Sequence, residues 1–226
     1  MNIRTLTFKG GTHPPHSKKA TESLPIERAN EPKVVVIPMQ QHIGAPCEPI
    51  VQAGDEVKVG QKIGEAKGFV SVPVHSSVSG KVAAVEPRLY SGGIAVTCVV
   101  IENDMQNTIS EQVVPKGDIS ILSAEDIKNI IKDAGIVGMG GATFPTHVKL
   151  APPPDKNVDT VILNGAECEP YLTSDHRLML EHPENVVFGL QALMKALGVK
   201  KGYIGIETNK PDAIEKVFEA ARGIED

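Results

Sequence analysis

Between residues 34 and 101, the apolar residues come in short runs that glycines separate from one another. The first run is Val34 to Pro38 and the last is Ala95 to Ile101. Runs of this length suit strands and are too short for most helices. Turn signals such as Gly92-Gly93 lie between them. This pattern predicts a small β barrel or sandwich over about residues 30–105.

The spacing of apolar residues changes near residue 120. Ser123 to Asp126 resembles a helix capping box, and Gly135 is a natural helix stop. Buried strands are predicted at Val158–Leu163 and Tyr203–Ile206, with a helix between them that opens at Pro183 and closes at Gly198. Another helix follows the second strand. Alternating strands and helices predict a parallel α/β unit.

We therefore predict an α+β multidomain chain. Residues 1–118 hold the β barrel, and residues 119–226 hold the first part of an α/β domain. Only two strands are clear in that sheet, so we expect the domain to be truncated at its C-terminus and the chain to be a fragment of a longer protein.

Composition and charge exclude several classes of function. A net charge of −5 with 4% aromatic residues does not suit a nucleic-acid binder. Every apolar run is far shorter than the roughly 20 residues that span a bilayer. The three cysteines are far apart and the histidines lack ligand spacing, so we predict no metal site in this chain. We also expect no catalytic nucleophile.

One hairpin suggests a carrier function. Residues 54–64 have the G-D-x-V-x-x-G-Q-x-I pattern of lipoyl and biotinyl carrier domains, and Lys67 follows them. The methionines that flank a modified carrier lysine are absent, however. Two hypotheses remain: a structural barrel of the lipoyl/biotinyl type, or a carrier modified at Lys67.

A glycine loop covers Gly138 to Pro145, and Lys149 follows it. The loop comes after a helix, whereas a Rossmann dinucleotide fingerprint comes after a strand. Dense glycines let a ligand approach the backbone, whose N–H groups bind anions. Lys149 adds a point charge for phosphate. The alternative is a tight turn with no ligand.

An acidic loop, Asn164 to Tyr171, follows the first predicted strand of the α/β unit. Ligands of open α/β sheets lie outside the carboxyl ends of the strands. The Asn164 amide suits the edge of a heterocycle, and Glu167 and Glu169 can accept hydrogen bonds from a ribose or a carboxamide. The alternative for both glutamates is a solvated turn.

Taken together, these motifs resemble the RnfC subunit of Rnf-type electron transport complexes. The resemblance begins at Gly10–Pro15 and continues through Gln41–Pro46, Gly68-Phe69 with Pro73–Ser77, and the two loops. The second half is similar, more distantly, to the flavin-bearing NADH-binding subunit of respiratory complex I.

The resemblance implies a barrel-sandwich hybrid followed by a partial Rossmann-like flavin and NADH domain. It implies a peripheral subunit on the cytoplasmic face of the membrane, in an ion-translocating complex that passes electrons between NAD(H) and ferredoxin. FMN and NAD(H) would bind the complete domain. Expected 4Fe-4S clusters would lie in the full-length protein, with ligands absent from this chain.

The resemblance also assigns the site. The residues carried over for flavin phosphate and ribityl contacts are Gly138, Gly140, Gly141 and Lys149; for the flavin ring, Asn164 and Glu167; and for the nicotinamide nucleotide, Phe144 and Glu169. Met139 and Ala166 stand where the NADH-binding protein of complex I usually has Arg and Asp. The alternative function is a structural docking subunit with a vestigial glycine loop.

Overall fold

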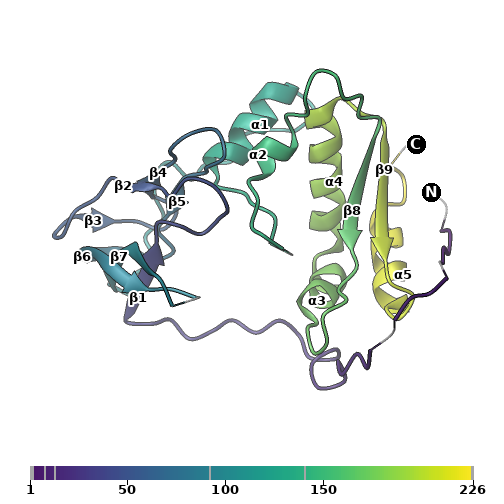
Figure 1. Ribbon diagram of the computed structural model, residues 1–226, viewed down its shortest axis with the longest axis horizontal. Helices are drawn as coiled ribbons and strands as arrows, with labels where there is room; N and C mark the ends of the chain where they lie inside the picture. Colours follow the sequence, from purple (N-terminus) through teal and green to yellow (C-terminus); the bar gives the residue numbers. More distant parts are fainter. Residues whose placement is uncertain (1–2, 8, 13, 92, 140, 225–226) are drawn as a thin grey trace. The chain divides into compact units, whose positions relative to one another are not determined.

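The computed structural model describes residues 3–7, 9–12, 14–91, 93–139 and 141–224. The chain forms two compact units, Asn30–Pro154 and a discontinuous one made of Met1–Ala29 and Asp155–Asp226. Both are drawn in Figure 1. We call them the barrel unit and the α/β unit.

The barrel unit contains two antiparallel sheets. One has the strand order β1-β7-β6-β3, where β1 is Val34–Pro38, β7 is Ala95–Asn103, β6 is Gly80–Leu89 and β3 is Glu56–Val57. The other has the order β2-β4-β5, where β2 is Glu48–Pro49, β4 is Lys62–Glu65 and β5 is Val74–His75.

A single hydrophobic core joins the two sheets. Val82, Val99 and Ile101 come from the first sheet, and Ile63 and Val74 come from the second. Val99, Ile101 and Ile63 are fully buried. The predicted barrel-sandwich hybrid is confirmed, because side chains of both sheets fill one interior.

Two helices also belong to the barrel unit: α1, Ala124–Asp133, and the one-turn helix α2, Thr146–Lys149. The predicted capping box of α1 is present, since Ser123 Oγ accepts from the Asp126 amide and Asp126 accepts from the Ser123 amide. Gly135 follows the helix with φ +70°. This left-handed backbone explains why glycine ends the helix there.

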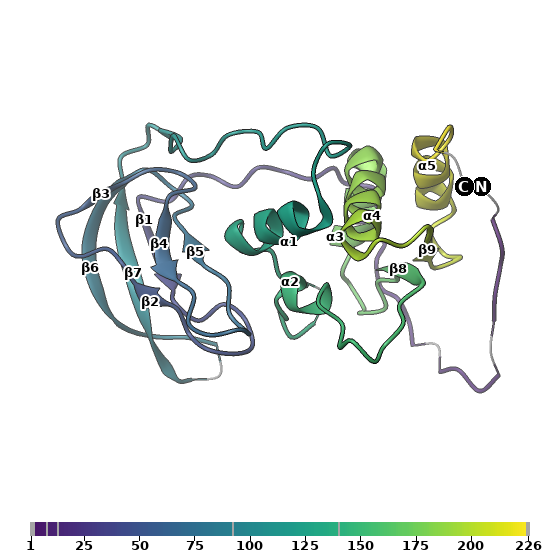
Figure 2. The same ribbon diagram turned by 90° about the horizontal axis from the view of Figure 1, so that it is seen from above.

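The α/β unit contains a parallel pair of strands, β8 (Thr160–Gly165) and β9 (Lys201–Ile206). Its helices are α3 (Ser174–Glu181), α4 (Pro183–Leu197) and α5 (Pro211–Ala220). Figure 2 shows α4 and α5 on one side of the strands. The predicted α4 limits are confirmed, because Pro183 is its first residue and Gly198 caps it at φ 68°.

A second hydrophobic core holds the α/β unit together. Met179 of α3, Val187 of α4 and Val217 of α5 are buried in it, and Ile204 and Ile206 of β9 pack against them. Gly202 lies so close to α4 that an added Cβ would be 2.5 Å from Met194 Sδ. The parallel α/β arrangement predicted from the sequence is confirmed.

Candidate functional site

The glycine loop lies in the barrel unit, between α1 and α2. Its base is closed by hydrogen bonds from the Gly138 amide to Phe144 O (3.0 Å) and from the Thr146 amide to Ile136 O (3.0 Å). These two hydrogen bonds join the ends of the loop, so that it forms a closed turn. Gly140 lies outside the described residues.

The side chain of Lys149 lies against this loop. A Cβ added at Gly138 would be 2.5 Å from Lys149 Nζ, whereas one added at Gly141 would meet nothing within 4 Å. Lys149 and Gly141 are exposed and Phe144 is half-buried. An exposed ammonium beside bare glycine backbone is a suitable environment for a phosphate or another anion.

The acidic loop lies in the α/β unit and starts at the carboxyl end of β8. Asn164 Oδ1 accepts the amide of Ala166 (3.0 Å), so that the side chain shapes the first turn of the loop. Asn164 and Glu169 are exposed. The structure brings both residues to the strand end where the sequence placed them.

Glu167 differs from its neighbours because its side chain is only 2% exposed. Its Oε1 accepts the Asp175 amide (2.8 Å) and the Ser174 hydroxyl (3.2 Å), which caps the start of α3. Its Oε2 is buried and has no hydrogen-bond partner among the described residues. The solvated-turn alternative is therefore wrong for Glu167.

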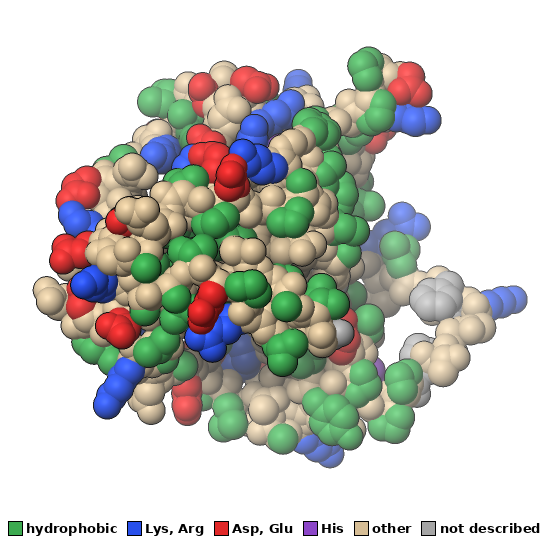
Figure 3. Space-filling view, turned by 60° about the vertical axis from the view of Figure 1, so that its left-hand side comes forward, with side chains coloured by type: hydrophobic (Ala, Val, Ile, Leu, Met, Phe, Trp, Pro, Cys, Tyr) green, Lys and Arg blue, Asp and Glu red, His purple; other side chains and the backbone are tan. Residues whose placement is uncertain are grey.

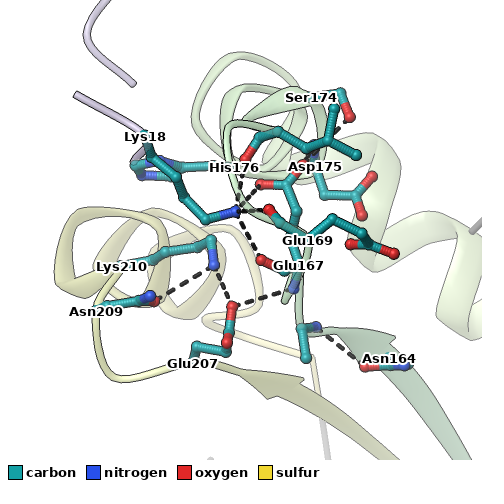
Figure 4. Close-up of polar contacts among 12 residues, drawn as sticks. Lys18, Asn164, Glu167, Glu169, Ser174, Asp175, His176, Glu207, Asn209 and Lys210 are labelled. Carbon is teal, nitrogen blue, oxygen red and sulfur yellow. Dashed lines mark hydrogen bonds and ion pairs between the residues drawn. The ribbon is translucent and has the colours of Figure 1, made fainter. Parts of the chain in front are cut away.

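Three charged residues that the sequence analysis did not single out surround Glu167, as Figure 4 shows: Lys18, Glu207 and Lys210. Glu207 Oε2 accepts the Glu167 amide (3.1 Å) and pairs with Lys210, which is 1% exposed. Glu207 follows β9 as Glu167 follows β8, and parallel strands end at the same edge. The strand-end rule could have found Glu207, but no local pattern marks Lys18.

Charge and burial act on the carboxylates here in opposite directions. Burial alone would raise the pKa of Glu207, but hydrogen bonds from Lys210 and the Glu167 amide outweigh it, so the pKa is lowered. Burial raises the pKa of Asp175, and the nearby Glu167 and Glu169 charges raise it further. Glu207 is thus held as a carboxylate, whereas a negative charge on Asp175 is disfavoured.

The remaining sequence candidates are Lys67 and the three cysteines. Lys67 is exposed and forms an ion pair with Glu48, which raises the pKa of its ammonium. All three cysteines are free thiols, with Cys47 and Cys98 buried in the barrel unit and Cys168 exposed in the acidic loop. Such a set does not fit an iron–sulfur cluster.

The comparisons with known proteins agree with this order of units. The RnfC barrel sandwich hybrid domain matches residues 6–106, and the Nuo51 FMN-binding domain matches residues 131–226. These matches define the class as a barrel-sandwich hybrid followed by a domain of the FMN-binding type. The predicted resemblance is confirmed: residues 6–106 match the barrel domain of RnfC, and residues 131–226 match the FMN-binding domain.

Three similar relatives are subunits of ion-translocating oxidoreductase complexes. The chain is 57% identical over 220 residues to a subunit of the Na(+)-translocating ferredoxin:NAD(+) oxidoreductase complex of Acetobacterium woodii, covering 97% of this chain and 50% of that protein. It is 52% identical over 217 residues to the proton-translocating counterpart of Clostridium ljungdahlii, covering 96% and 48%. It is 40% identical over 224 residues to a subunit of the ion-translocating oxidoreductase complex of Rhodobacter capsulatus, covering 98% and 43%.

The chain thus spans about half the length of the curated relatives it matches. A solved structure of an NAD+-reducing [NiFe]-hydrogenase is 26% identical to the chain, and the match covers 43% of this chain and 18% of the hydrogenase chain. Its TM-score of 0.38 is too low to establish a shared fold. Within the described parts of the chain, no helix has the length and apolar character needed to cross a bilayer.

Proposed function

We propose that this chain supplies flavin-binding loops to a peripheral subunit of an ion-translocating complex that passes electrons between NAD(H) and ferredoxin. The observation that carries the proposal is the order of its two domain matches, together with 57% identity to a protein of a complex with that activity. The cytoplasmic face of the membrane, the other subunits as partners and 4Fe-4S clusters elsewhere in the protein belong to the same proposal.

The described residues have features that fit FMN. The exposed Lys149 ammonium and the open backbone at Gly141 suit a phosphate, and the orphaned Glu167 Oε2 leaves a buried acceptor free for a donor group. When bound, FMN would supply the chemistry that takes a hydride from NADH and releases electrons one at a time.

Each proposed residue then has a binding role and none is a nucleophile. Gly138, Gly140, Gly141 and Lys149 would hold the flavin phosphate and ribityl chain. Asn164 and Glu167 would contact the edge of the flavin ring, where the Asn164 amide can donate or accept and Glu167 accepts, fixed by its bonds to the start of α3. Phe144 and Glu169 would contact the nicotinamide nucleotide.

An FMN titration followed by quenching of flavin fluorescence tests the proposal. We would compare the 226-residue chain with a fusion that continues into the remaining half of the Acetobacterium woodii relative. Lys149→Ala is expected to weaken binding about tenfold, since a hydrogen bond to a charged group contributes about 1.5–3 kcal/mol. Lys116→Ala, at another exposed lysine, is the matched control. If neither wild-type protein binds FMN while folded, the proposal fails.

Gly141→Val is a second, sharper variant. The fold has room for the added side chain, because a Cβ at Gly141 meets nothing within 4 Å. A valine there would nevertheless cover the backbone that a phosphate must approach. We expect lost FMN affinity with an unchanged melting temperature. Unchanged affinity would remove the glycine loop from the proposed site.

One observation favours the docking alternative for the barrel unit. Leu89 and Ile94, at the end of the β6–β7 hairpin, are 82% and 58% exposed, and Val34 and Val36 of β1 are exposed too. Figure 3 shows hydrophobic side chains between charged ones on the face it presents. Binding of residues 30–154 to purified membrane subunits, without any effect of FMN on the full chain, would favour docking as the main role.

A further inference from the structure

Lys18 lies in the N-terminal segment of the α/β unit, Met1–Ala29, which we call the leader. It precedes Glu167 by 149 residues. Its side chain is only 6% exposed. Its ammonium donates to the backbone oxygens of Glu167 (2.7 Å), Glu169 (3.0 Å) and Leu172 (2.6 Å). Figure 4 shows Nζ lying among these oxygens. An ammonium has three N–H donors, so the acidic loop and the residue after it, Leu172, use all of them.

This geometry determines the shape of the loop. Three carbonyl groups over residues 167–172 must turn toward one point, which leaves the backbone between them little freedom. The same ammonium lies 3.8 Å from Glu167 Oε2, so its charge offsets the buried carboxylate without using up that oxygen as an acceptor. Lys18 thus fixes the loop and keeps Glu167 Oε2 available.

Other hydrogen bonds of the leader are to α3 and to the residue before it. They hold the leader to α3 and its flanks: Thr21 with Thr173 (2.8 Å), Glu22 O with Arg177 (3.2 Å) and the Ile26 amide with Glu181 (2.9 Å). Among the described residues, the leader also contacts the acidic loop through the Tyr171 amide, which donates to His16 O (2.9 Å). Within that part of the chain, Lys18 is the leader side chain that bonds to the loop.

We propose that Lys18 is a positioning residue, whose ammonium holds the acidic loop in the conformation that receives the flavin ring. This inference rests on the proposed function for its flavin part. The clamp on the loop is a separate statement that can be measured without any flavin.

The test uses four variants of the full chain. Lys18→Met removes the ammonium but keeps the length of the side chain. Lys18→Arg keeps the charge and replaces the compact ammonium by a planar fork, which cannot reach three converging oxygens in the same way. Lys19→Met is the matched control at an exposed neighbour. Thr21→Val loosens the leader at α3 without touching the acidic loop.

The measurements are hydrogen exchange of residues 164–173 without flavin, FMN affinity, and the absorption spectrum of bound FMN. We expect Lys18→Met to speed exchange in this loop, to weaken FMN binding about tenfold, and to change the spectrum of bound flavin. Lys19→Met should change none of these. Thr21→Val should lower the melting temperature but leave affinity and spectrum unchanged, which separates positioning from general stability.

The outcomes distinguish the two proposals. Wild-type FMN affinity in a folded Lys18→Met variant overturns the inference and leaves the proposed function intact. If Lys18→Met does not fold, Lys18→Arg decides, because wild-type exchange and affinity in that variant overturn the three-oxygen clamp. If neither the wild-type chain nor the fusion binds FMN while folded, the proposed function and the flavin part fail together. Unchanged exchange in Lys18→Met would overturn the clamp as well.

Discussion

At the scale of single residues, the burial of a polar side chain changes its chemistry in a way that the local sequence does not indicate. His75 ends β5, half-buried, and burial lowers its pKa from the ordinary 6.5, with a smaller contribution from the Lys62 charge. The folded state therefore binds a proton at His75 less readily than the unfolded state does. Stability from this group is complete above about pH 6.5 and is lost as the pH falls toward the lower folded pKa.

We therefore expect His75→Gln to reduce the pH dependence of stability in the barrel unit. The free energy of unfolding in urea would be measured at pH 7.5 and at pH 5.5, with hydrogen exchange in β6 and β7 as the probe of the barrel unit. Wild type should lose more stability between these pH values than the variant does. His182→Gln, at an exposed histidine of the α/β unit, is the control. Equal losses in wild type and His75→Gln would contradict the prediction.

Gly80 gives a second residue-scale prediction. Its φ is +147°, and an added Cβ would lie 2.0 Å from Glu102 O of the neighbouring strand. Gly80→Ala should therefore lower the free energy of unfolding by roughly 3 kcal/mol, through backbone strain and a clash that the sheet cannot relieve. Gly54→Ala, at φ +100° with nothing within 4 Å of an added Cβ, isolates the strain. It should cost only about 1 kcal/mol in the same denaturant titration.

The candidate site was predictable only where the signal was local. Asn164 to Glu169 were placed at a strand end because β8 could be read from its apolar run, and the structure puts the loop there. The burial of Glu167 was not predictable, since it depends on α3, on Glu207 after β9 and on Lys18 in the leader. The assignment of these residues to flavin and nicotinamide stays a prediction.

At the scale of elements, end signals were more informative than hydrophobic periodicity. Ser123, Pro183 and Gly198 mark helix ends through their own backbone or hydroxyl chemistry, and the structure confirms all three. Helix α3 was not predicted. Its buried residues are His176 and Met179, so it lacks an apolar stripe. His176 is satisfied by Asp212 of α5 at 2.9 Å, a partner that no local pattern reveals.

The cap of α1 gives the prediction at this scale. Hydrogen bonds with Ser123 lower the pKa of Asp126, which shows that the capping box favours the charged carboxylate. Ser123→Ala removes one side of that box and should destabilise α1 by about 1 kcal/mol. Hydrogen exchange over residues 124–133 would measure the change. Unchanged exchange in the first turn would show that packing of Ile127 and Ile131 alone holds the helix.

At the scale of the whole chain, the α/β unit is discontinuous, because Met1–Ala29 joins Asp155–Asp226 while the residues between them form the barrel unit. The sequence predicts one region over residues 1–118 and the next over residues 119–226, and those limits stay a prediction. Periodicity describes neighbours along the chain. It does not report that a polar, proline-bearing leader will pack on helices more than 100 residues later.

The last prediction follows from this connectivity. A chain that begins at Asn30 lacks Lys18 and every leader contact with α3, so Glu167 keeps a buried charge without its cation. Breaking a buried ion pair typically costs about 3–5 kcal/mol, so α3 and the acidic loop should lose much of their exchange protection. The barrel unit should keep its protection from exchange, because its buried core residues lie within residues 37–101. Hydrogen exchange measured peptide by peptide on both chains would check this, and a truncated chain with full protection over residues 164–181 would show that the leader is dispensable for the fold.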